Sequence, residues 1–136
     1  MALLKRRMIF ISHAWRYDDH YRTIERWLNE EPNFIWSNSS VPNTNALPDK
    51  TSAGLSRGMT RQITPSQVVL IIAGMYANHS AWIEYEIKEA QRLGKKIIGI
   101  RPRGHERTPR IVQDASICPL VSWSRSSVIR AIRTYA

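Results

Sequence analysis

The sequence predicts a single α/β domain in which helices cover both faces of a parallel β-sheet. Short apolar, β-branched runs alternate along the chain with segments whose apolar residues recur at helical spacing. One run, residues 67–73, is apolar almost throughout, as expected for a strand that is covered on both faces. A chain of 136 residues can bury one ordinary core, so we predict one domain over residues 1–136.

Five strands are expected, and this number suits a flavodoxin-like sheet with right-handed crossovers. The first strand ends at the polar pair Ser12 and His13, and the second follows a helix that residues 31–33 (Glu-Pro-Asn) terminate. The predicted strands are residues 8–11, 34–36, 67–73, 96–100 and 118–123.

Helices are expected between and after these strands. Asp19 is a residue typical of a helix start, Ser80 is expected to cap the helix after the third strand, and Gly94 is expected to end that helix. The predicted helices are residues 19–29, 51–63, 81–93, 108–115 and 124–135.

The composition excludes several classes of protein. Hydrophobic residues make up 43% and charged residues 23%, which is typical of a globular domain rather than a disordered chain. No apolar run approaches the roughly 20 residues that span a bilayer, and no signal peptide is recognised, so we expect a cytoplasmic protein without membrane contact. The single cysteine, Cys118, excludes an internal disulfide, and the histidines lack metal-ligand spacing, so no metal is predicted.

The formal net charge of +9 could indicate a nucleic-acid partner, an anionic substrate or only a solvated surface. The arginines are scattered, with one local enrichment at residues 101–110, and basic and aromatic residues do not alternate as in single-strand binders. We therefore do not expect a nucleic-acid partner.

The helix predicted over residues 81–93 carries a carboxylate where an apolar side chain is expected. Ile83, Ile87 and Ala90 form the centre of its apolar face, and Glu86 falls on the same half of the helix. A carboxylate in this position is costly unless it has a partner. Glu86 is therefore either a structural carboxylate with an internal partner or one that faces a ligand cleft.

Ligands of such sheets bind beyond the carboxyl ends of the strands, where residues 12–17, 37–45 and 74–80 are expected. Ser12 and His13 could meet a phosphate or a ribose, although His13 could equally cap the strand end. Trp36 could stack on a base or be a core tryptophan. The chain has no glycine-rich nucleotide fingerprint, no G-x-S-x-G elbow and no acidic pocket of the phosphoacceptor type.

Five segments in order resemble the TIR-like domain family, whose members include the TIR-like component of Thoeris antiphage systems. The segments are residues 10–15 (FISHAW), 33–42 (NFIWSNSSVP), 73–76 (AGMY), 80–87 (SAWIEYEI) and 94–99 (GKKIIG). The resemblance implies a flavodoxin-like TIR fold and cleavage of NAD+ at the bond between nicotinamide and ribose. It also implies an ADP-ribose-derived, often cyclic, nucleotide that activates a separate effector protein.

The family's catalytic glutamate lies in a W-x-x-x-E arrangement, which here corresponds to Trp82 and Glu86. The resemblance thus implies that Glu86 is catalytic, that NAD+ is the substrate and that no other cofactor is needed. Assembly between TIR domains is a further implication. The substrate-binding residues that we expect are Phe10, Ser12, His13, Trp15, Trp36, Asn38, Tyr76 and Trp82.

Two other functions remain open at this stage. The chain could be a non-catalytic adaptor that uses a TIR-like surface for assembly, in which case an internal partner should neutralise Glu86 and no cleft should lie in front of it. It could also bind nucleic acid, which predicts a continuous basic face and a steep dependence on salt.

Overall fold

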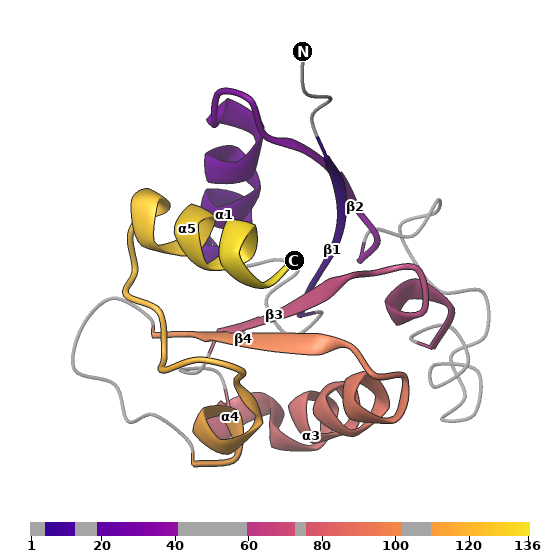
Figure 1. Ribbon diagram of the computed structural model, residues 1–136. Helices are drawn as coiled ribbons and strands as arrows, with labels where there is room; N and C mark the ends of the chain where they lie inside the picture. The colour runs from indigo at the N-terminus through magenta and orange to yellow at the C-terminus, as the bar shows by residue number, and fades with distance from the viewer. Residues whose placement is uncertain (1–4, 13–18, 41–59, 73–75, 102–109) are drawn as a thin grey trace.

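A computed structural model describes residues 5–12, 19–40, 60–72, 76–101 and 110–136. Its core is a four-stranded parallel sheet in the order β2-β1-β3-β4 (Figure 1). β1 therefore lies between β2 and β3. Each strand overlaps the run that predicted it, and the fourth has the predicted bounds. The strands are β1 (Arg6–Ile11), β2 (Ile35–Asn38), β3 (Val68–Ile72) and β4 (Lys96–Ile100).

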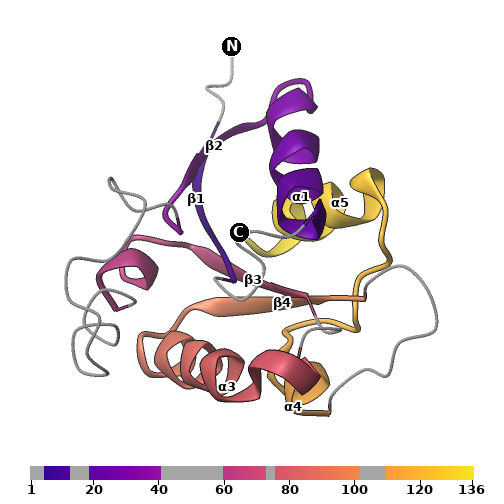
Figure 2. The same ribbon diagram turned by 180° about the vertical axis from the view of Figure 1, so that it is seen from behind.

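Helices cover both faces of the sheet, as predicted. α1 and α5 lie together on one face and α3 and α4 on the other, and the reverse view gives the same arrangement (Figures 1 and 2). Within the described ranges, no helix is both long and apolar enough to cross a membrane. The helices are α1 (Asp19–Glu30), α3 (Tyr76–Arg92), α4 (Arg110–Ala115) and α5 (Arg125–Tyr135).

The alternation of side chains along β1 divides the core into two clusters. Ile9 and Ile11 belong to the cluster beneath α1 and α5, whereas Phe10 belongs to the cluster beneath α3 and α4. All three side chains are fully buried. Ser12 follows directly and, by the same period of two, continues the face on which Phe10 lies.

Helix α3 ends as predicted but begins earlier. Gly94 has a positive φ of 71°, and the amides of Gly94 and Lys95 donate to the carbonyls of Gln91 and Ala90, which is the pattern of a Schellman motif. The helix begins at Tyr76, so the predicted start at residue 81 is wrong, and Ser80 lies within the helix. Residues 77–79 (Ala-Asn-His) carry no strong break signal, so the preceding turn can extend through them.

The other helix predictions are confirmed as far as the structure describes them. Ser124 caps α5 by accepting a hydrogen bond of 3.2 Å from the amide of Ser127. α4 is described over Arg110–Ala115, and residues 108–109 of the same prediction lie outside the described ranges. Residues 60–63 are helical, and residues 51–59 of the same prediction lie outside the described ranges.

The fifth strand, predicted over residues 118–123, is wrong, because only Val121 pairs with β4. The amides of Ile117 and Val121 donate to the carbonyls of Ile97 and Gly99, which are two residues apart on β4. Four residues of the segment from Ile117 to Val121 thus span the length of two residues of β4, so the intervening chain must bulge away from the sheet. Pro119 lies in this bulge, and it has no N–H to offer to a ladder.

The close approach of this segment to β4 predicts the effect of a substitution at Gly99. A Cβ there would lie 2.5 Å from Leu120 Cδ2 and 3.2 Å from Val112 Cγ1. Gly99→Ala should therefore lower the free energy of unfolding by about 1–3 kcal/mol, the usual cost of overpacking. Chemical denaturation measures the change. Lys96→Ala, at an exposed position on the same strand, is the control, and equal losses in both variants would contradict the explanation.

Candidate functional site

A buried hydrogen bond joins the end of β1 to helix α3. Ser12 Oγ donates to Glu86 Oε1 over 2.7 Å, and neither residue has any exposed surface. The amide of Ser12 also donates to the carbonyl of Leu70 on β3, over 2.9 Å, so its backbone is fixed to the sheet. The structure thus brings together two residues, 74 positions apart, that were both predicted to belong to the site.

The sequence places the two side chains opposite each other for separate reasons. Strand alternation directs Ser12 to the α3 side of the sheet, and helical periodicity puts Glu86 on the same face of α3 as Ile83, Ile87 and Ala90, all of them buried. Because α3 begins at Tyr76, Glu86 lies almost three turns into the helix, about 15 Å from its start. The carboxylate therefore sits above the sheet beside the end of β1.

A second buried carboxylate on α3 gives a useful contrast. Glu89, 8% exposed, pairs with the Arg92 guanidinium, whose Nε lies 2.7 Å from Glu89 Oε1. This hydrogen bond is the main reason why the pKa of Arg92 is raised. Glu89 is therefore neutralised by a cation on its own helix, whereas the contact of Glu86 with Ser12 comes from a neutral hydroxyl.

A separate polar network surrounds Asn38 at the end of β2. The Asn38 amide donates to Tyr21 OH over 2.9 Å and to Glu25 Oε2 over 3.1 Å, while its oxygen accepts from the amide of Ser40 over 2.9 Å and from the Ser40 hydroxyl. Tyr21 OH and Ser40 Oγ are themselves 2.7 Å apart. Both ends of the Asn38 side chain are occupied, so its role in the described structure is to fix the chain where β2 ends.

This network lies on the other face of the sheet from Glu86. Tyr21 and Glu25 belong to α1, whereas Glu86 belongs to α3. Asn38 pairs with Ile9, three residues before Ser12 and thus about 10 Å from it along the strand. The structure therefore brings Ser12 to Glu86 but does not bring Asn38 to Glu86.

Two of the expected substrate-binding aromatic residues are packed into the protein. Phe10 is fully buried in the cluster beneath α3 and α4. Trp36 is partly buried against the opposite cluster, and its Nε1 donates to Asn29 Oδ1 over 2.8 Å. Trp36 pairs with Arg7, five residues before Ser12, which corresponds to about 16 Å along β1.

The remaining expected residues lie at or beyond the limits of the described structure. His13 and Trp15 fall outside the described ranges. Tyr76 and Trp82 belong to helix α3, but their side chains are outside the description. Among the described residues, no three His, Cys, Asp or Glu side chains gather as metal ligands.

The sequence did not predict the hydrogen-bonding partners of Asn38, which are Tyr21, Glu25 and Ser40. One local signal was available, because Asn38 and Ser40 stand two residues apart at a strand end, and asparagine in such a place often accepts from the amide two residues on. No comparable signal exists for Glu25, since its contact with Asn38 depends on how α1 packs against the sheet.

Comparisons with known proteins agree with this architecture. Residues 10–107 match the family described as "Thoeris protein ThsB, TIR-like domain". No curated protein matches the chain significantly. The solved structure of the Clostridium botulinum CMP N-glycosidase BcmB is similar with a TM-score of 0.59 and 15% identity, over 96% of this chain and 100% of that one. A 2-deoxyribosyltransferase from Bacillus psychrosaccharolyticus is similar with a TM-score of 0.59 and 12% identity, over 89% of each chain.

The Ser12–Glu86 contact predicts an energetic coupling between the two positions. Ser12→Ala removes a donor from a buried carboxylate, which should lower the free energy of unfolding by about 1–3 kcal/mol. In a double-mutant cycle with Glu86→Gln, chemical denaturation should give an interaction free energy of about 0.5–3 kcal/mol. Strict additivity of the two substitutions would show that the contact does not contribute to stability.

Proposed function

Because the chain belongs to the family of TIR-like domains of the Thoeris protein ThsB, we propose that it cleaves NAD+ between nicotinamide and ribose. The remaining ADP-ribosyl group becomes a signalling nucleotide, cyclic in form, that activates a separate effector in a cytoplasmic defence against phage. The observation that carries the proposal is the buried carboxylate of Glu86, held by Ser12 where β1 ends.

The chemistry calls for a fixed negative charge beside the ribose. When the bond between the ribose C1′ and the nicotinamide nitrogen breaks, its electron pair leaves with neutral nicotinamide, and positive charge builds on the ribose as in glycoside hydrolysis. A carboxylate that is already oriented stabilises this charge without having to reorganise. We assign this role to Glu86. A nucleophilic atom of the ADP-ribosyl group itself then bonds to C1′ and gives up a proton, which yields the cyclic product; attack by water instead would yield ADP-ribose.

Ser12 is a positioning residue in this proposal. Its hydroxyl donates to one oxygen of Glu86, and its amide is bonded to β3, so that the carboxylate is held against the rigid part of the sheet. We assign the Glu86 carboxylate to the ribose. His13 and Trp15 directly follow Ser12, and we propose that they contact the ribose and the phosphate.

The similar solved structures support this type of chemistry on this fold. An N-glycosidase acts on a bond between a sugar carbon and a ring nitrogen, which is the type of bond that we propose for NAD+. The position of Glu86 also supports the proposal, because its carboxylate accepts from Ser12 at the carboxyl end of β1, where ligands of parallel sheets bind.

Replacement of Glu86 tests the proposal directly. Glu86→Gln keeps the shape of the side chain but removes its charge, so release of nicotinamide from NAD+ should fall by about a hundredfold or more. Purified protein is incubated with NAD+ at low and high protein concentration, since assembly could complete the site, and the products are resolved by mass spectrometry.

Glu89→Gln is the matched control, because it neutralises the neighbouring buried carboxylate on the same helix. This variant should retain turnover, and circular dichroism should show that both variants are folded. Equal activity of Glu86→Gln and the wild type would exclude the catalytic role of Glu86. Absence of turnover by the wild type, both purified and in extracts of phage-infected cells, would favour the adaptor function instead.

A further inference from the structure

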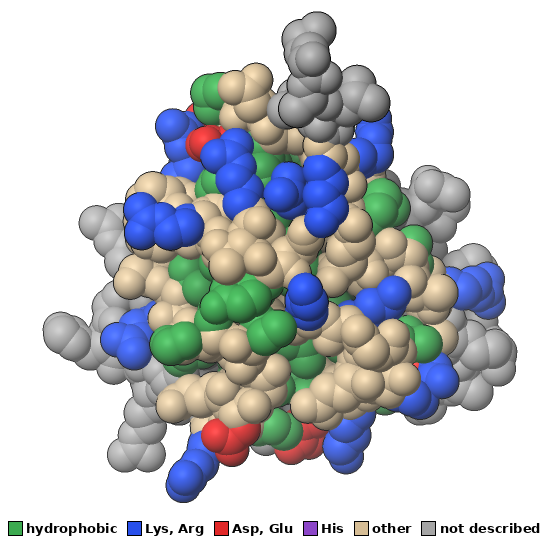
Figure 3. Space-filling model, in the orientation of Figure 1, with side chains coloured by type: hydrophobic (Ala, Val, Ile, Leu, Met, Phe, Trp, Pro, Cys, Tyr) green, Lys and Arg blue, Asp and Glu red, His purple; other side chains and the backbone are tan. Residues whose placement is uncertain are grey.

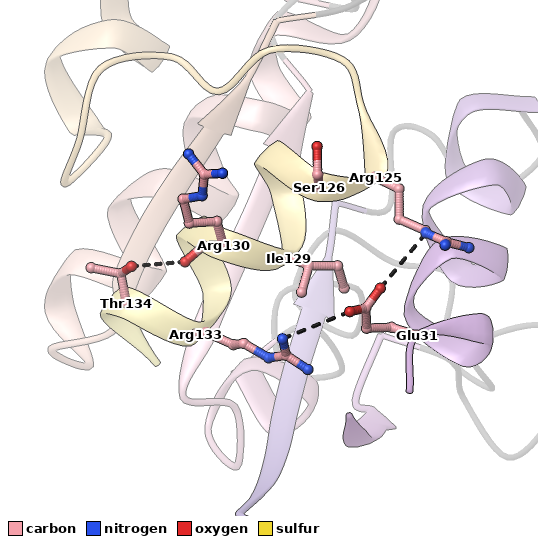
Figure 4. Close-up of a pocket in the computed structure, with 7 residues that line it drawn as sticks. All are labelled: Glu31, Arg125, Ser126, Ile129, Arg130, Arg133 and Thr134. Carbon is pink, nitrogen blue, oxygen red and sulfur yellow. Dashed lines mark hydrogen bonds and ion pairs between the residues drawn. The ribbon is translucent and has the colours of Figure 1, made fainter. Parts of the chain in front are cut away.

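Basic side chains lie over α1 and α5, on the face of the sheet opposite α3. Figure 3 shows Lys and Arg side chains across the whole view, several of them in its upper part, where few acidic groups are seen. Beside α5 this surface is hollowed into a cavity of about 430 Å³ (Figure 4). Its lining residues are Glu31, Arg125, Ser126, Ile129, Arg130, Arg133 and Thr134.

The cavity is distinct from the site at Glu86. α5 and α3 lie on opposite faces of the sheet (Figures 1 and 2). Glu31 follows the last residue of α1, and a helix that connects two parallel strands returns to the edge where the strands begin. The cavity therefore opens near the amino ends of the strands, whereas Ser12 stands at a carboxyl end.

The lining carries three guanidinium groups and one carboxylate. The Glu31 side chain, which is 20% exposed, forms ion pairs with two of these guanidinium groups. Arg125 Nε lies 3.6 Å from Glu31 Oε1, and Arg133 Nη1 lies 3.7 Å from Glu31 Oε2. Figure 4 shows both arginine side chains turned toward Glu31 from the two ends of α5. Arg130 has no carboxylate partner in the part of the chain that the structure describes.

Arg133 of the lining also lies close to a further positive charge, that of Arg7. The guanidinium groups of Arg7 and Arg133 both lie against the ring of Phe34, 5.5 and 5.7 Å from its centroid. Burial is the main cause that lowers the pKa of Arg7, and the positive charge of Arg133 lowers it further. Arg7 Nε is buried and has no hydrogen-bond acceptor among the described residues. An anion bound above these groups would relieve their repulsion.

We propose that this cavity binds the phosphate or pyrophosphate group of a small molecule. The phosphate oxygens accept from Arg130 and Arg133, with the Ser126 hydroxyl as a further donor, and Glu31 keeps Arg125 and Arg133 in place when the cavity is empty. Arginine suits phosphate because its planar fork donates two parallel hydrogen bonds. The volume falls in the range of small-molecule sites, about 300–1,000 Å³, and the inward carboxylate of Glu31 disfavours the continuous backbone of a nucleic acid.

Calorimetric titration of the full chain with inorganic pyrophosphate, ADP and adenosine tests the proposal. Pyrophosphate and ADP should bind, and adenosine, which lacks a phosphate, should not. Arg130→Ala should weaken pyrophosphate binding about tenfold or more, since a hydrogen bond to a charged group is lost. Arg133→Ala should act in the same direction, but Arg133 also donates to the carbonyl of Pro32 over 3.1 Å, so Arg130→Ala is the variant that leaves the fold untouched.

Two further variants separate the site from general charge effects. Arg110→Ala removes an equal charge from α4, on the other face, and should change pyrophosphate binding less than twofold. Glu31→Gln should tighten pyrophosphate binding, because it removes the competing carboxylate.

The proposal would be overturned by absence of pyrophosphate binding at millimolar concentration, by an equal loss of affinity in Arg110→Ala and Arg130→Ala, or by loss of pyrophosphate binding in Glu86→Gln. The last result would place the ligand at the Glu86 site. Equal binding of adenosine and ADP would also overturn it.

Discussion

The candidate site depends on a single constraint, the strict alternation of side chains along the central strand β1. Because Ile9 and Ile11 must face α1 and α5, Phe10 and Ser12 must face α3. A shift of one residue in the pairing of β1 would move Ser12 away from Glu86 and leave a buried carboxylate without its hydroxyl partner. The hydrophobic pattern of β1 thus fixes the position of the Ser12 hydroxyl, although Ser12 belongs to neither hydrophobic cluster.

Much of the fold could be predicted because its elements are marked locally. Continuous apolar runs predicted β3 and β4, and Gly94 predicted the end of α3 because only glycine readily adopts its φ of 71°. The start of α3 could not be predicted from Ser80. Serine favours a helix start, but here it lies inside a helix that begins at Tyr76. The fifth strand failed because composition does not report backbone pairing: residues 118–123 are apolar enough, but Pro119 and the extra residues beside β4 prevent a ladder.

In the candidate site, the sequence predicted the residues whose positions follow from strand or helix periodicity. Glu86 stood out as a carboxylate on an apolar helix face, and Ser12 as the polar residue after the first strand. Which of these residues meet depends on packing between elements, so neither the contact itself nor the placement of Asn38 on the opposite face could be predicted. The same holds for Glu31 with Arg125 and Arg133, because these residues are about 100 positions apart and appeared in the sequence only as scattered charges.

The place of β1 in the sheet also has a consequence for how the protein folds. Both strands that pair with β1 come later in the chain. The amide of Met8 in β1 donates to the side chain of Gln67, which directly precedes β3 and lies 59 residues away. Pairings of this kind must overcome the entropy of closing a long loop before they contribute any stability, which makes parallel sheets slow to form. During synthesis, β1 can pair with β2 early, but it can pair with β3 only after half of the chain has been made, and Ser12 can meet Glu86 only after α3 has followed.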